Sequence, residues 1–583
     1  MRPVAAVTLG LLLFMDAVRV LFPSLITIYG QAGDTPPEQL GLFAALWFVL
    51  PLAALLIPAK WALLGGAGVL ALGRLALQAT DGGLPQLYVS AVSVTAGIVF
   101  LYGAARLVAR PHARPALPLG LALSQALHLS IGHLDLVWRD GLLPWIPTVL
   151  VAVAFAWAVL GVTAAADPAP ARLWFALGPA ILLAGMYLGP SALIGQGTTP
   201  GDRLWPTLAL LAALAVLALA GTAGHPAQLA PILMIVGVWI AHDDGHLRAA
   251  TLPIFALGLG WCLRVAGDGP PGRRPGGALL AGMIVFFVGT FVYYAAYDLV
   301  LGFDNAYVPL ALGLVVAATA VRLPDLPQVL PAVAAGLAVL ALWALPQPRA
   351  TEGPGVAVDR DEFTLIAYNI RMGFGTSGTL DLDEIADWAA SKKPDVVLLS
   401  EVDRGWFLNG GHDDLDRIAT RLGMHFHFAP AADELWGDAV LTNLPIRNIQ
   451  SAPLVTEGYP TGAQAQTVVV EVGGAPVGIV NTHLQEPELQ SATLHGVMPP
   501  APALVAGDLN LTPGDPAFQR LLAEIGLTDP LKDLGDPPTS PADDPVKRID
   551  HVLLTEGLTA VSAEVPRVPF SDHLPVVMRI RVG

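Results

Sequence analysis

The chain has 583 residues, 54% of them hydrophobic and 13% charged, and a formal net charge of −16. Soluble globular proteins carry about 25% charged residues, so this composition and a mean hydropathy of +0.60 exclude an ordinary soluble protein. The single cysteine, Cys262, excludes an intrachain disulfide and a cysteine-based zinc site. It lies in an apolar run and is expected to be a small buried side chain.

Charge divides the chain into two parts. Residues 1–350 contain 16 Lys/Arg and 14 Asp/Glu, whereas residues 351–583 contain 15 and 33. The boundary falls in the Pro/Gly-rich stretch LPQPRATEGPGVAVDRDE. We therefore predict a polytopic α-helical membrane domain at 1–346, a linker at 347–361 and a soluble, acidic domain at 362–583.

The membrane domain contains about thirteen apolar segments long enough to cross a bilayer, which takes roughly 17–25 residues. They are 3–29, 40–57, 60–79, 86–106, 116–137, 143–165, 173–195, 205–222, 227–241, 249–266, 277–302, 307–321 and 327–346. The N-terminus lacks a clear small-x-small cleavage site, so the first segment is expected to be a retained span.

The loops between these segments differ in Lys/Arg content. With the N-terminus inside, one side collects ten basic residues: Arg2, Lys60, Arg106, Arg110, Arg114, Arg172, Arg264, Arg273, Arg274 and Arg322. The other side collects three: Arg139, Arg203 and Arg248. Because cytoplasmic loops are rich in Lys and Arg, an odd number of spans and an extracytoplasmic C-terminal domain are predicted. One span more or fewer would reverse that side.

Several ionisable residues fall within the predicted spans: Asp16, Arg19, Arg74, His128, His133, Asp135 and Asp298. Charges in hydrocarbon are costly and often mark functional interiors. Asp16 and Arg19 are three residues apart and could pair on one helix face; interfacial snorkelling and a structural ion pair are the alternatives. The two histidines and Asp135 form the best candidate cluster, without a known metal-ligand spacing.

The soluble part alternates β-rich runs with amphipathic helices. Strands are predicted at 363–370, 395–402, 438–443, 466–472, 476–484, 503–510, 548–555 and 575–582. Helices are predicted at LDEIADWAASKK, LDRIATRLG and FQRLLAEIG. About 230 residues are enough to bury a full core.

Polar residues stand at the ends of these strands. Asn369, Glu401, His483, Asp508 and Asn510 lie at or near the C-terminal ends of apolar strands, Asp550 lies early in another, and Asp572 and His573 precede the last strand. If the strands lie side by side, these side chains converge on one edge of a sandwich. Each Asp or Asn taken alone reads as a local turn cap, but the ordered set is more specific.

The residue types indicate metal-assisted attack of water on phosphorus. Carboxylates and amides are hard oxygen donors that suit Mg²⁺, with Mn²⁺ or Ca²⁺ as alternatives. An Asp beside a His fixes its tautomer. A metal and an imidazolium would balance charge that develops on phosphoryl oxygens.

The chain resembles the endonuclease/exonuclease/phosphatase superfamily, which has the deoxyribonuclease I-like fold. The matching pieces are YNIRMG, PDVVLLSEVD, GDAVLTNLPI, VNTHLQ, VAGDLNLTP, RIDHVLLT and SDHLPV, in the family's order. The resemblance covers roughly 361–583 and implies a four-layer α/β sandwich with two facing sheets. One departure is the Pro-rich stretch between His483 and Asp508, where members usually have a fuller helix.

The resemblance also implies roles for the polar residues. Glu401 would be the principal Mg²⁺ ligand beside Asn369, with help from Asp572. Asp508 would orient or deprotonate the nucleophile, and Asn510 would bind phosphate or metal. His483 and His573 would contact the scissile phosphate, with Asp550 paired to His573. Asp438 and Arg404 are nearby candidates, although surface or capping roles are favoured for both.

The architecture further resembles multispan membrane proteins that end in this catalytic domain, including eukaryotic proteins implicated in remodelling GPI-anchor lipids to ceramide. EVDRGW, the run LGMHFHFAPAADELWGDAVLTNLPI and RVLFPSLITIYG carry that resemblance. The Ala/Gly/Pro/Leu-rich composition suggests a GC-rich bacterium and its cell membrane, where an inositol lipid or another phosphodiester lipid is the more plausible substrate.

Three functions follow as hypotheses. The first is a membrane-embedded, metal-dependent phosphodiesterase that acts on a lipid head group by hydrolysis or transfer. RGWFLNGG and Trp436 could then contact the lipid surface, or they could pack in an ordinary core. The second is a membrane-tethered nuclease; the 33 acidic residues disfavour it, because nucleic-acid binding depends on Lys/Arg contacts. The third is a transporter or scaffold with an inactive domain.

Overall fold

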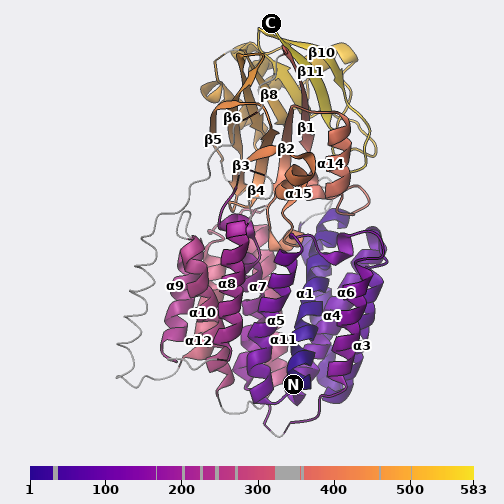
Figure 1. Ribbon diagram of the computed structural model, residues 1–583, viewed down its shortest axis with the longest axis vertical. Helices are drawn as coiled ribbons and strands as arrows, with labels where there is room; N and C mark the ends of the chain where they lie inside the picture. The colour runs from indigo at the N-terminus through magenta and orange to yellow at the C-terminus, as the bar shows by residue number, and fades with distance from the viewer. Residues whose placement is uncertain are drawn as a thin grey trace.

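The protein consists of a helical part and an α/β part stacked end to end (Figure 1). The computed structural model describes residues 1–29, 37–165, 167–197, 199, 204–222, 227–242, 248–269, 274–297, 299–321, 355, 360–457, 461–500 and 502–583. The N-terminus lies at the end of the helical part that points away from the α/β part, and the C-terminus lies at the opposite tip of the molecule.

Twelve of the thirteen predicted spans coincide with helices in the described residues. The helices are α1 (Arg2–Tyr29), α2 (Pro37–Val49), α3 (Ala59–Leu77), α4 (Gly83–Leu107), α5 (Arg110–Ser130), α6 (Trp145–Val159), α7 (Ala171–Leu188), α8 (Leu204–Ala220), α9 (Leu229–His242), α10 (Arg248–Gly267), α11 (Pro275–Ala295) and α12 (Tyr307–Ala320). The segment 327–346, Asp298 and the linker, apart from residues 355, 360 and 361, lie outside the described residues.

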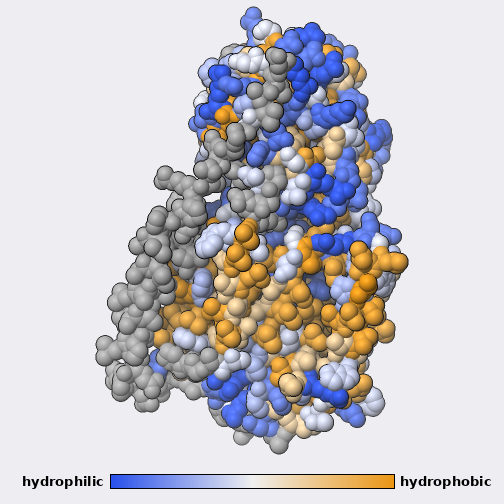
Figure 2. Space-filling model, in the orientation of Figure 1, coloured by the Kyte–Doolittle hydropathy of each residue, from blue (hydrophilic) through white to orange (hydrophobic). Residues whose placement is uncertain are grey.

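The helical part has the composition of a membrane-embedded body. Six helical segments of the described chain are long and apolar enough to cross a membrane, and five more apolar helices are shorter. On the face shown in Figure 2, apolar surface covers the middle of this part, with polar surface at its lower end and over the α/β part. Charged residues inside the bundle are paired: Asp16 lies 3.8 Å from Arg19, as its spacing indicated, and 3.3 Å from Arg74.

The α/β part contains two sheets. Its strands are β1 (Glu362–Asn369), β2 (Val396–Asp403), β3 (His425–Ala432), β4 (Trp436–Thr442), β5 (Ile446–Pro453), β6 (Gln464–Val472), β7 (Ala475–Thr482), β8 (Ala503–Asp508), β9 (Asp550–Leu554), β10 (Leu558–Glu564) and β11 (Val576–Val582). Eight of these strands match predicted ones; β3, β5 and β10 were not predicted.

The sheets have the orders β10-β11-β1-β2-β4-β3 and β5-β6-β7-β8-β9. Alternate residues of β1 explain the packing: Leu365 joins the apolar core between the sheets, whereas Ile366 joins the core beneath the predicted helices α14 (Leu382–Ser391) and α15 (Asp414–Leu422). The third predicted helix, α17 (Pro516–Ile525), covers the other sheet. The α/β part is therefore a helix–sheet–sheet–helix sandwich.

The stretch before Asp508 is short of helix, as its prolines indicated. It contains the five-residue helix α16 (Pro487–Ser491) and the 3₁₀ turn Leu494–Val497. The site-bearing strands β7 and β8 are nevertheless paired in parallel.

The two parts share one apolar core. Trp406, Phe407 and Trp436 are nearly fully buried and belong to the core cluster of the helical part. The Phe407 ring lies 6.1 Å from that of Phe22 and 6.2 Å from that of Phe286. Of the two alternatives for RGWFLNGG and Trp436, the structure supports packing in a core: Trp406, Phe407 and Trp436 lie between the two parts and not at an outer surface.

Candidate active site

A bulge in β2 presents Glu401 to the site. The pairing of β2 with β4 shifts register between Leu399 and Val402, and Glu401 has a φ of +54°. A bulge re-aims the side chain it carries, and a positive φ is unfavourable for a residue other than glycine and concentrates at functional sites. The glutamate side chain is thus held where an ordinary strand would not place it.

Gly507 brings Asp508 close to the neighbouring strand. Its φ is +129°, and a Cβ there would stand 2.1 Å from the carbonyl oxygen of Thr482. Only glycine fits this approach. It delivers Asp508 to the end of β8, where the side chain is 2% exposed.

Asn369 joins these two carboxylates. Its Nδ2 donates to Glu401 Oε1 and to Asp508 Oδ2, each at 3.0 Å. Burial raises the pKa of Glu401, and the nearby Asp572 raises it further. Burial also acts to raise the pKa of Asp508, but His573 and His483 outweigh it and the pKa is lowered. Asp508 is therefore the more firmly ionised of the two acids.

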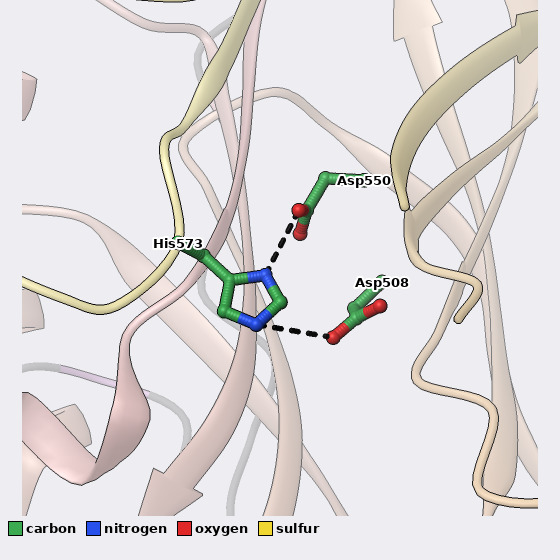
Figure 3. Close-up of side chains that lie close together, drawn as sticks. All are labelled: Asp508, Asp550 and His573. Carbon is green, nitrogen blue, oxygen red and sulfur yellow. Dashed lines mark hydrogen bonds and ion pairs between the residues drawn. The ribbon is translucent and has the colours of Figure 1, made fainter. Parts of the chain in front are cut away.

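His573 lies between two carboxylates (Figure 3). Its Nδ1 is 2.9 Å from Asp550 Oδ2, and its Nε2 is 3.8 Å from Asp508 Oδ2. Burial acts to lower the pKa of His573, but Asp550 and Asp508 raise it well above its ordinary value. The ring is held protonated, with its Nε2 turned towards Asp508.

His483 and Asn510 form the opposite side of the cluster. His483 Nε2 lies 3.5 Å from Asp508 Oδ2 and 3.3 Å from Asn510 Nδ2. Asn510 also donates to the carbonyl of Leu484 at 2.9 Å. Asn510 is exposed, whereas the two histidines are buried, so this asparagine stands at the mouth of the site.

Arg371 ties Asp572 to the helical part. Its Nε lies 3.5 Å from Asp572 Oδ2, and its Nη2 donates to the carbonyl of Thr27 in α1 at 2.9 Å. The sequence interpretation did not select Arg371. Its place two residues after Asn369 in YNIRMG was the available signal.

The structure thus gathers all eight predicted site residues. The donor set fits a divalent cation. Four carboxylates, Glu401, Asp508, Asp550 and Asp572, lie beside one arginine and two histidines, and their oxygens are hard ligands. Asp508, Asp550 and His573 bring ligand atoms within 4.8 Å of one another, as no other His/Cys/Asp/Glu group does in the described part of the chain, but both nitrogens of this histidine already face carboxylates.

Two further predictions were wrong. Asp438 and Arg404 were expected at the surface or in caps, but they are 1% and 3% exposed. Asp438 accepts from Gln464 Nε2 at 2.7 Å, and burial raises its pKa to about 6. Arg404 pairs with Asp413 and donates to Gln196 of the helical part at 2.6 Å. Their burial follows from tertiary contacts that the local sequence does not encode.

One side of the site borders the helical part. Tyr297, which follows α11, stacks on Trp406 at 4.8 Å, Trp406 stacks on Trp436 at 6.0 Å, and Trp436 lies 6.0 Å from the ring of His483. This aromatic row runs from the end of a helix to a site histidine. The site combines a carboxylate–imidazole pair, an excess of carboxylates and an apolar border. This combination is typical of enzymes that act on phosphate esters.

Comparison with known families supports that class. Residues 366–573 match the model of the Endonuclease/Exonuclease/phosphatase family, so the chain carries a domain of this family. Members hydrolyse phosphoric esters, as phosphatases or nucleases, and generally need a divalent metal. No curated protein matches the chain.

Solved structures of the same family are similar to the α/β part. An endonuclease/exonuclease/phosphatase from Beutenbergia cavernae DSM 12333 has 26% identity over 38% of this chain and 72% of that chain, with a TM-score of 0.33. The human Nocturnin catalytic domain with bound sulfate has 21% identity over 39% and 97%, with a TM-score of 0.32. A mannosyl-6-phosphatase from Bacteroides thetaiotaomicron VPI-5482 has 15% identity over 37% and 99%, with a TM-score of 0.32.

Proposed function

We propose that this protein is a membrane-embedded, Mg²⁺-dependent phosphodiesterase that acts on the phosphate of a lipid head group, by hydrolysis or by transfer to an alcohol. An inositol lipid or another phosphodiester lipid is the substrate class. The observation that carries the proposal is the aromatic row of Tyr297, Trp406 and Trp436, which runs from the helical part to the site residue His483.

Three further contacts support this arrangement. Phe407 N–H donates to Tyr294 Oη at 3.0 Å, Tyr293 Oη donates to Asp433 at 2.7 Å, and Gln196 Nε2 donates to the carbonyl of Glu434 at 2.9 Å. A large apolar interface with such hydrogen bonds holds domains in one orientation. In this orientation a lipid head group at the membrane surface would lie close to the site, whereas a long nucleic-acid duplex would clash with the helical part.

Charge supports a lipid substrate over a nucleic acid. Residues 351–583 hold 33 acidic and 15 basic residues, and a polyanion needs Lys/Arg contacts to bind.

We place the helical part at 1–346, the linker at 347–361 and the catalytic domain at 362–583. The Lys/Arg asymmetry of the loops supports an extracytoplasmic catalytic domain.

In this proposal Glu401, Asn369 and Asp572 would hold the metal, which would supply positive charge to balance the charge that develops on the phosphate. Asp508 orients the attacking hydroxyl and accepts its proton. His573, held by Asp550, donates a hydrogen bond from Nε2 to a phosphoryl oxygen, and His483 contacts the phosphate from the other side. Asn510 binds the phosphate at the mouth of the site.

The test uses the full-length protein in vesicles that contain phosphatidylinositol. Head-group release that stops with chelator, returns with Mg²⁺ and disappears in Glu401→Gln and His573→Ala supports the proposal. Release that is retained in both variants contradicts it. Turnover of radiolabelled DNA with intact lipids would favour the tethered nuclease, and no metal-dependent turnover of either would favour an inactive domain.

A further inference from the structure

Arg371 lies where the catalytic site meets the end of α1. The residue is 4% exposed, and its Nε lies 3.5 Å from Asp572 Oδ2. Its backbone N–H donates to Oδ1 of Asn369 at 3.0 Å, which leaves the amide nitrogen of Asn369 to donate to Glu401 and Asp508. One residue thus contacts two of the three side chains that we assign to the metal.

The guanidinium of Arg371 is anchored on α1. Its Nη2 donates to the carbonyl oxygen of Thr27 at 2.9 Å. Because α1 ends at Tyr29, this carbonyl belongs to the last turn, where backbone carbonyls lack partners within the helix and form the negative end of the helix dipole. Arg371 supplies both the donor and the positive charge that such a helix end favours.

The backbone at Arg371 is fixed by both parts of the molecule. Arg371 and Met372 have φ values of +46° and +53°, in a region that residues other than glycine rarely adopt and that persists where the surroundings impose it. Met372 packs against the apolar core of the helical part and against the core beneath α14 and α15. Its sulfur also accepts from Asn409 Nδ2 at 3.0 Å.

The rest of α1 is seated on the α/β part as well. The ring of Phe22 lies 6.1 Å from that of Phe407. Pro23 offers no N–H to the carbonyl of Arg19, and a Cβ at Gly410 would stand only 2.9 Å from that carbonyl oxygen. Successive turns of one helix thus contact the α/β part, and the contact at its C-terminal end reaches the catalytic site.

We propose that Arg371 is a positioning residue of the catalytic site, through which the end of α1 sets the orientation of Asp572. The proposal rests on the proposed metal-dependent function and deepens it, because it makes the helical part a component of the site as well as its anchor. The side chain of Asp572 is 20% exposed. Among the described residues its carboxylate accepts one other hydrogen bond, of 3.4 Å, from the neighbouring Ser571. Without Arg371 it is free to turn towards solvent.

The sign of the effect on metal affinity separates positioning from charge. Arg371 is a cation beside four carboxylates, so its charge by itself opposes the binding of another cation. Loss of that charge alone would tighten metal binding. Loss of the residue that orients Asp572 should weaken it, by about 10–100-fold as for other residues that hold a metal ligand in place.

The test uses the full-length protein in nanodiscs. Asparagine tolerates the left-handed conformation, so Arg371→Asn removes the guanidinium and keeps the backbone. Arg371→Gln retains an N–H donor without a charge for Asp572, and it serves if the first variant fails to fold. Arg404→Asn is the matched control, because Arg404 is 3% exposed and also donates to the helical part, at Gln196, but its carboxylate partner is Asp413. Gln196→Ala removes the same contact from the other side.

Two quantities are measured: the affinity for Mn²⁺ by electron paramagnetic resonance, and kcat per folded molecule for bis-p-nitrophenyl phosphate. Both should fall about 10–100-fold in the Arg371 variants. The control variants should lower the apparent Tm and leave both quantities unchanged. In an Asp572→Ala background, Arg371→Asn should have little further effect on either, because residues that act through one another are not additive.

Three results would overturn the proposal: wild-type values in the Arg371 variants, tighter Mn²⁺ binding, or an undiminished effect of Arg371→Asn in the Asp572→Ala background. A wild type that binds Mn²⁺ but hydrolyses neither lipid nor the soluble diester would contradict the proposed function instead, and Mn²⁺ affinity would still decide the role of Arg371. A wild type that binds no Mn²⁺ would contradict both.

Discussion

Two buried polar clusters of the molecule differ in their charge balance. The cluster in the helical part contains two carboxylates, Asp16 and Asp135, and two guanidinium groups, Arg19 and Arg74. Both arginines lie within 4 Å of Asp16. In the α/β part, acidic side chains exceed basic ones, and the backbone at Glu401 and Asn510 has positive φ values of +54° and +49°. The charges of the first cluster pair with one another, whereas the second cluster holds negative charge and backbone strain that its own residues do not relieve.

This difference indicates that the polar residues of the first cluster serve stability and that those of the second serve catalysis. A balanced ion-pair network stabilises a fold once formed and is strongly destabilised by loss of one partner. A cluster with excess negative charge becomes more stable when a cation binds or when one of its like charges is removed. The same type of substitution should therefore affect stability in one cluster and turnover in the other.

The largest effect is expected for Asp508→Ala in the catalytic cluster. In the proposed mechanism Asp508 orients and deprotonates the nucleophile, so its loss should lower kcat by about 10²–10⁴-fold. The apparent Tm should fall less than in Arg19→Met, because removal of one charge from an acid-rich cluster offsets the lost contacts with Asn369 and the two histidines. Head-group release and thermal unfolding measure both effects, with the exposed Asp544→Asn as control; a larger loss of stability than in Arg19→Met would contradict the distinction between the clusters.

The reverse pattern is expected for Arg19→Met. Arg19 is 1% exposed and holds Asp16, Ser124 and Gln125. Removing it leaves a buried carboxylate short of one partner, which costs about 3–5 kcal/mol. The apparent Tm should fall while kcat per folded molecule stays unchanged, and a selective loss of kcat would instead link this cluster to catalysis.

Phe407→Ala tests the contact between the two parts. Deletion of this ring leaves a cavity among Phe22 and Phe286 and should cost about 3 kcal/mol. Release of lipid head groups should fall more than hydrolysis of bis-p-nitrophenyl phosphate, a soluble diester that needs no membrane orientation. Equal losses for both substrates would mean that docking does not direct the site.

The smallest effect concerns pH. Burial lowers the pKa of His412, which packs beside the interface, from 6.5 to about 3. The unfolded chain therefore binds a proton that the folded chain excludes between these values, so stability is constant above pH 6.5 and falls below it by about 1 kcal/mol per pH unit. His412→Gln should flatten part of the decline in apparent Tm between pH 7 and 5, and parallel curves would exclude the contribution of this histidine.

The interior strands could be read from the sequence because both of their faces are buried. β1 and β8 are near-continuous apolar runs, as expected for strands covered on both sides. The three strands that were not predicted, β3, β5 and β10, are all edge strands. β5 is largely exposed, and β3 contains Pro430, so neither carries the continuous apolar signal.

The candidate site was predictable for a related reason. Asn369, Glu401 and Asp508 interrupt apolar runs at strand ends, so their position in the sheet follows from the strand itself. The buried environment of Asp438 and the partners of Arg371 depend on residues far away in the chain, such as Gln464 and Thr27. Local pattern carries no information on such contacts.

The insertion of Phe407 between α1 and α11 has a consequence for biosynthesis. The helices precede the α/β part in the chain, so they are synthesised before it. The site that accepts Phe407, beside Phe22 and Phe286, is therefore formed before the α/β part folds. When the α/β part folds, its apolar segment around Phe407 is buried there and is not left exposed to aggregation. Each part thus covers apolar surface of the other. If the gene is split at the linker, the two products should be stable only when they are made together.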